Sequence, residues 1–111
     1  MPEQTDRLAE IQLRAAKATP GPWCTDSWEI YQGTEYTPGI SQWIGETCRG
    51  NTTTTQDRAD AAFVAAARTD VPWLIAELTE ARAKLATAER QLAEADDALA
   101  DRFAIPGEDA A

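Results

Sequence analysis

Histidine is absent from this sequence of 111 residues, and the residue patterns that build most enzyme sites are scarce. Without histidine, the commonest general base and the usual member of a catalytic triad are missing. The six glycines are scattered singly, so the chain shows no phosphate-binding loop. Acidic pairs such as Asp96 and Asp97 lie in a charged run that is typical of a solvated helix face. We therefore expect a protein that is not an enzyme and that needs no cofactor.

Cysteine is also rare, and occurs only as Cys24 and Cys48. Two cysteines are too few for a disulfide scaffold. Without histidine they cannot complete an ordinary four-ligand zinc site within one chain, so we expect no metal site. Two buried, reduced thiols are the simpler interpretation. In the alternative, the two cysteines lie opposite each other on paired strands and can form a disulfide.

Positively charged residues and long apolar runs are also scarce. The chain has 10 Lys and Arg residues against 19 Asp and Glu residues, which gives a formal net charge of -9. Such a surface repels a phosphate backbone, so direct binding to nucleic acid is not expected. The chain has no apolar stretch of about 18 residues, and its first residues lack the basic and apolar regions of a signal peptide. We expect a soluble, cytoplasmic protein with no membrane partner.

The first third of the chain predicts a helix, a sharp turn and a small sheet. Apolar residues recur at helical spacing from about Arg7 to Lys17, with Thr5 or Asp6 available as the N-cap, and the prolines of residues 18–23 then end the helix. Residues 23–49 hold both tyrosines and most of the tryptophans, which favours strands at 28–31 and 42–48. We expect an antiparallel meander of two or three strands that packs one face on a helix.

The remainder predicts two helices. Residues 50–56 form a polar loop, with Thr54 and Asp57 spaced as a capping box. A short helix at 57–67 then places Ala59, Ala62, Phe63 and Ala66 on one face against the sheet. A break at 68–72 precedes a helix from 71 to about 102, with Pro72 in its first turn. The expected α+β fold thus has a head at 1–75, a coiled-coil helix at 76–103 and a disordered tail at 104–111.

A row of leucines dominates the last helix. Leucine recurs every seven residues, with alanine three residues later, and the resulting seam of a and d positions contains Leu74, Leu78, Ala81, Leu85, Ala88, Leu92, Ala95 and Leu99. Beyond about Ala81 the remaining sequence offers no segment long enough to cover this seam, so we expect a homo-oligomer, either a dimer or a tetramer. A single solvated helix and a helix from another protein are the alternatives. Lys84 and Glu89 slightly favour parallel pairing, whereas the small alanines suit antiparallel packing, so the orientation stays open.

Two segments in this order resemble the Ead-like family of small phage and prophage accessory proteins, in the form found in actinobacterial phages. The resemblance covers roughly residues 7–80 and rests on Ala18-Thr19-Pro20-Gly21-Pro22-Trp23 and on Asp60-Ala61-Ala62-Phe63-Val64-Ala65-Ala66-Ala67 followed by Asp70-Val71-Pro72 and Leu74. It implies an early-expressed accessory protein without catalytic residues, in the cytoplasm of the host cell. In such a scaffold Trp23 anchors the turn, Phe63 fills the helix–sheet interface and Pro72 starts the long helix.

Two functions follow as expectations. In the first, the oligomer binds a host protein and changes its activity. In the alternative, the protein sequesters a nucleotide signal of host defence: the aromatic side chains of the sheet stack on a base, Arg49 pairs with phosphate, and the threonine-rich loop at 52–55 offers donors to an anion. The candidate ligand-binding residues are Trp28, Tyr31, Tyr36, Trp43 and Arg49.

Overall fold

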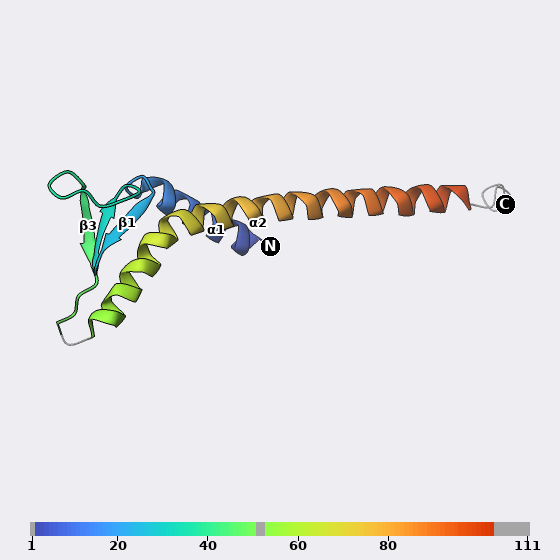
Figure 1. Cartoon of the computed structure of the whole chain (residues 1–111). Coiled ribbons are helices and arrows are strands. Elements are labelled where there is room, and N and C mark those ends of the chain that lie inside the picture. The colour runs from blue at the N-terminus through green and yellow to red at the C-terminus, as the bar shows by residue number, and fades with distance from the viewer. Residues whose placement is uncertain (1, 51–52, 104–111) are drawn as a thin grey trace. The chain divides into compact units, whose positions relative to one another are not determined.

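The computed structural model describes residues 2–50 and 53–103, with side chains from Arg7 onwards (Figure 1). The element order is α1 (Pro2–Lys17), β1 (Trp23–Asp26), β2 (Glu29–Gln32), β3 (Trp43–Glu46) and α2 (Thr54–Arg102). The expected N-terminal helix, small antiparallel sheet and long C-terminal helix are confirmed, and the fold is α+β. The chain divides into two units, the first ending at Ala76 and the second beginning at Glu77.

The sheet is an antiparallel meander with the strand order β1-β2-β3. A two-residue turn joins β1 to β2, and Ser27 takes the positive φ of 57° that tight hairpin turns require. Turns between β2 and β3 contain Gly33 and Gly39, whose φ angles are 118° and 76°. The structure adds the third strand, β1, directly after the proline-rich turn.

The core lies between one face of the sheet and α2. Ile30 is 3% exposed, and it packs with Ala61 and Ala65, which are 0% and 6% exposed. The two alanines are four residues apart, so they lie on the same side of α2, and their small side chains let the helix approach the sheet closely. Trp23 and Ile44 pack against this cluster from its edge. Figure 1 shows the first turns of α2 running beside the sheet.

The predicted face of α2 is wrong. Ala59, Ala62 and Ala66 are exposed, and Phe63, expected at the helix–sheet interface, is 76% exposed. Apolar side chains occur on almost every side of residues 59–67, so their pattern does not define a single inward face. The space between Ile30 and α2 is filled by the small side chains of Ala61 and Ala65. A phenyl ring does not fit in this space.

The predicted break at 68–72 and the short separate helix are also wrong, because α2 runs unbroken from Thr54 to Arg102 with Pro72 inside it. A proline inside a helix removes one N–H donor, here to the carbonyl of Arg68, and it crowds that carbonyl. The longer stretches on both sides, residues 59–68 and 74–102, are rich in Ala, Leu, Glu and Arg, which are good helix formers and support the helix across this defect.

Both expected helix starts need correction. The N-terminal helix begins at Pro2, so Thr5 and Asp6 lie inside α1 and not at the predicted N-cap position. The cap of α2 is Thr53, whose hydroxyl accepts a hydrogen bond of 3.1 Å from the backbone N–H of Gln56. The N-cap is thus one residue earlier than predicted, and the Gln56 side chain, at the position that a capping box gives to Glu or Gln, donates to Asp60.

The corner between α1 and β1 is fastened to α2 by two side chains. The indole N–H of Trp23 donates to the carbonyl oxygen of Thr19 at 3.1 Å, and the Nε–H of Arg68 donates to the same oxygen at 2.8 Å. The Arg68 guanidinium also lies over the Trp23 ring, 6.0 Å from its centroid. Trp23 therefore anchors the proline-rich turn, as the sequence predicts, and Arg68 connects this turn to α2.

Candidate functional site

An aromatic patch occupies the face of the sheet that points away from α2. Side chains alternate along a strand, so Tyr31 lies opposite to the buried Ile30. The Tyr31 and Tyr36 rings are tilted by 37° with centroids 4.4 Å apart, and Trp43, 55% exposed, is the β3 partner of Tyr31. The structure thus brings together three of the predicted ligand-binding residues.

The charge of this patch does not suit an anion. The Tyr31 hydroxyl donates a hydrogen bond to the carboxylate of Glu29, and this bond, with partial burial and the nearby negative charge, raises the pKa of Tyr31 well above its ordinary range. Asp26 and Glu46 are the register partners of Glu29 on either side, so three carboxylates share this face. A phosphate placed on these rings would meet negative charge.

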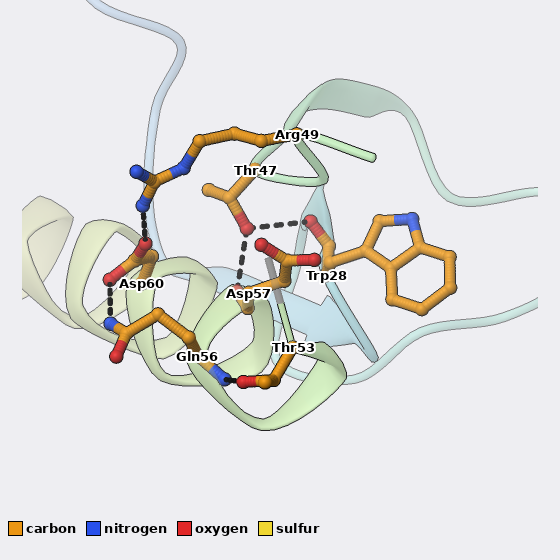
Figure 2. Close-up of polar contacts among 7 residues, drawn as sticks. All are labelled: Trp28, Thr47, Arg49, Thr53, Gln56, Asp57 and Asp60. Carbon is orange, nitrogen blue, oxygen red and sulfur yellow. Dashed lines mark hydrogen bonds and ion pairs between the residues drawn. The ribbon is translucent and has the colours of Figure 1, made fainter. Parts of the chain in front are cut away.

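Trp28 and Arg49, the other two candidates, lie apart from the patch in a polar network that joins β3 to the start of α2 (Figure 2). Arg49 forms an ion pair with Asp60, which also accepts a hydrogen bond of 2.9 Å from the Gln56 side chain. These two bonds hold the pKa of the Asp60 carboxyl below its ordinary value. Arg49 would have to leave Asp60 in order to bind a phosphate.

Thr47 links the two sides of this network. Its hydroxyl donates to the carbonyl oxygen of Asp57 at 2.6 Å, and its backbone N–H donates to that of Trp28 at 3.1 Å. Asp57 is 2% exposed, and Figure 2 shows its side chain among these groups, while the Trp28 ring points away from them. This arrangement has a structural purpose: it fixes the first turns of α2 against the sheet.

A groove of about 370 Å³ lies between α1 and α2, with Trp23 at its side. Its lining is mostly apolar and includes Ile11 and Ala15 of α1 and Val64 of α2. Phe63 adds an exposed ring, and Arg14 and Arg68 are the charged residues that line it. This surface is not evident from the sequence, in which Phe63 is expected in the core. Apolar lining with a few charged groups is the usual character of a binding groove.

The leucine row lies on the surface of α2. Leu74, Leu78, Leu85, Leu92 and Leu99 are between 41% and 65% exposed, and Ala81, Ala88 and Ala95 of the same seam are also exposed. The polar contacts of this stretch stay within the helix: Lys84 pairs with Glu80 at 3.0 Å, one turn apart. The exposed seam is compatible with assembly, and the coiled coil stays a prediction.

The cysteines do not face each other. Cys24 is half-buried on β1 and pairs in register with Tyr31, whereas Cys48 follows β3 and is exposed, so the prediction of two buried thiols is wrong for Cys48. Both are free, and β2 separates their strands. Two strand spacings of about 4.8 Å exceed the Cα separation that a disulfide accepts.

Comparisons with known proteins do not identify a family for this chain. No protein-family model, curated protein or solved structure matches the chain.

Within residues 2–50 and 53–103, no three His, Cys, Asp or Glu side chains gather as metal ligands would. In the same part of the chain, no helix combines the length and apolar character that crossing a membrane requires.

Proposed function

We propose that this protein is a homo-oligomeric interaction protein, in which the leucine row joins copies and the head binds another protein without catalysis. The observation that carries the proposal is the exposure of Leu78, Leu85, Leu92 and Leu99 along one side of a continuous helix. Scattered exposed leucines are normal on a protein surface, but a contiguous row with a seven-residue repeat is typical of a helix–helix interface.

The available burial supports an assembly of moderate affinity. Full burial of a leucine side chain stabilises by about 1.5–3 kcal/mol, and these four are roughly half exposed. Each leucine therefore contributes about 1 kcal/mol in each copy. The loss of translational and rotational freedom on association opposes a substantial part of this sum. Dissociation at low concentration is expected to be measurable.

The groove between α1 and α2 is the surface of the head that best suits a protein partner. Phe63, 76% exposed on α2, offers an apolar anchor, and Arg14 and Arg68 offer positive charge on a chain whose net charge is -9. Aromatic residues and arginine are the types that contribute most to protein interfaces. The Ead-like resemblance makes a host protein the expected partner.

Light scattering on a charged seam variant tests the assembly. Leu85→Asp with Leu92→Asp places carboxylates in the seam, and the expected result is a monomer under conditions where the unchanged protein is an oligomer. Ala86→Asp with Ala93→Asp is the matched control, because it adds the same charges one residue outside the seam and should leave the mass unchanged. Equal masses for both variants and the unchanged protein would refute the proposal.

Mass spectrometry of the protein purified from infected or nucleotide-rich lysate distinguishes the proposal from the sequestering alternative. A co-purifying polypeptide that Phe63→Asp abolishes and Trp43→Asp retains supports binding through the groove. A retained small molecule that Trp43→Asp abolishes supports the aromatic patch as a ligand site and contradicts the proposal for the head.

A further inference from the structure

We propose that two copies pair their α2 helices in antiparallel orientation. In the proposed register each leucine of the seam packs against an alanine of the partner, except in the end layers, where leucine packs against leucine. The proposal rests on the self-association inferred above and names its geometry. The layers it assigns, each residue followed by its neighbour in the second copy, are Leu74 with Leu99, Leu78 with Ala95, Ala81 with Leu92 and Leu85 with Ala88, and each layer occurs twice by symmetry.

Side-chain size favours this orientation. In a parallel pair, equivalent positions face each other, so leucine layers alternate with alanine layers. Two leucines hold the helices apart, and the next alanine layer, about 5 Å along the axis, then leaves a void. In an antiparallel pair each a position faces a d position, so a large side chain meets a small one in layer after layer. Between the two end layers, where Leu74 faces Leu99, the helices then keep one separation and no void is left.

The end of the seam fixes the register. In the assigned register Leu99 faces Leu74, and all layers between them are apolar. A slide by one heptad in one direction places Arg102 against Leu78 and leaves Leu74 without a described partner. A slide in the other direction removes Leu99 from the overlap and shortens the interface. The assigned register is the one that covers every leucine of the row.

Two features of the charge distribution favour the same orientation. Between Arg90 and Arg102 the helix carries four carboxylates and no cation: Glu94, Asp96, Asp97 and Asp101. A parallel pair would place these acidic ends side by side, where like charges repel. The antiparallel pair separates the two acidic ends and brings Arg82 near the partner's Glu89, although residues 94–101 then lie opposite residues 72–79 of the partner, which include Glu77.

A parallel pair would offer its own ion pairs, between Lys84 and the partner's Glu89 and between Glu77 and the partner's Arg82. Exposed ion pairs contribute little to stability, and Lys84 already has a carboxylate neighbour in its own helix, Glu80 at 3.0 Å. The packing of the apolar layers therefore outweighs these surface pairs and decides the orientation.

The antiparallel arrangement has a consequence for function. The two copies of Leu74 lie about 37 Å apart along the axis, as against about 10 Å across a parallel pair. The two segments of α2 that line the grooves therefore lie at opposite ends of the paired seam, which favours separate binding of partners.

Disulfide trapping tests the arrangement. In a Cys24→Ser, Cys48→Ser background, copies with Ala81→Cys and copies with Leu92→Cys are mixed with distinguishable mass tags and equilibrated in a thiol redox buffer. The antiparallel register predicts a mixed disulfide several-fold in excess of either symmetric one. The matched pair Ala86→Cys and Ala93→Cys lies outside the seam and should show no such preference.

The outcomes separate the two proposals. An excess of symmetric disulfides, with the same oligomer mass, overturns the antiparallel arrangement and leaves self-association intact. A monomeric mass for the unchanged protein, without trapped dimers, overturns the proposed function itself. A spin-label distance between Ala76→Cys copies gives an independent measurement. About 30 Å along the axis supports the antiparallel pair, and less than about 20 Å overturns it.

Discussion

Substitution of Ile30 by alanine should unfold much of the head, whereas the same change at Phe63 should have almost no effect. Ile30 is 3% exposed at the centre of the core, and Phe63 is 76% exposed in the groove. Isoleucine-to-alanine changes in cores cost about 2–5 kcal/mol, including the cavity that remains. Few side chains share this core, so such a loss is a large part of the stability that a small domain has.

The expected effect at Phe63 follows from the same quantities. About a quarter of this side chain is shielded, so its removal loses about 0.5 kcal/mol of burial. Alanine has the higher helix propensity by a similar amount, and the two effects nearly cancel. Phe63→Ala should therefore shift the free energy of unfolding by less than about 0.5 kcal/mol.

Urea unfolding followed by tryptophan fluorescence measures both variants, because Trp23 packs against the core cluster and reports on it. The measurements belong in the Leu85→Asp, Leu92→Asp background, so that self-association does not add to the apparent stability. If Phe63→Ala lowers the unfolding midpoint as much as Ile30→Ala does, the assignment of the inward face of α2 is wrong.

A second pair of variants checks that face independently. Ala61 is 0% exposed, and Ala61→Leu should cost about 1–3 kcal/mol because the added methyl groups have no space against the sheet. The neighbouring Ala62 is exposed, so Ala62→Leu should be close to neutral. Equal effects of the two changes would contradict the packing of α2 described above.

Three further predictions concern the start of α2 and the thiols. Thr53→Ala should destabilise the protein by about 1 kcal/mol in urea unfolding, because it removes the N-cap, and Thr54→Ala should cost less. Because the pKa of Asp60 is lowered in the folded protein, its ionised carboxylate stabilises the fold at pH values above the ordinary carboxyl pKa. This contribution is lost as the pH falls through the lowered pKa. Asp60→Asn should therefore reduce the acid dependence of the unfolding midpoint. In native protein, Cys48 should react with a thiol reagent faster than Cys24, which is half-buried; equal rates would contradict their placement.

The sheet and its turns were the more predictable part of the fold. Prolines at 20 and 22 end any helix for steric reasons, and the aromatic and β-branched residues that follow favour strands. Gly33 and Gly39 lie in turns and have positive φ angles. These are local effects, and they act whatever the rest of the chain does.

The packing of α2 could not be predicted, because it depends on the shape of the surface that it meets. Alanine is common along residues 59–67, so hydrophobicity does not distinguish Ala61 from Ala62. Phe63 is the largest apolar side chain there and attracts assignment to the core, yet the surface beside Ile30 accepts only small residues. Among the ligand candidates, the sequence showed the aromatic residues of the patch but not the partner of Arg49, which lies eleven residues away at Asp60.

The continuity of α2 through Pro72 connects the groove to the leucine row. Because the helix is unbroken, its heptad phase is preserved, and Val64, Ala67 and Val71 fall at the same a and d positions as the leucines that follow. These three residues line the groove that α1 borders. One apolar stripe therefore meets α1 of the same chain at its beginning, whereas its later part has no covering segment among the described residues.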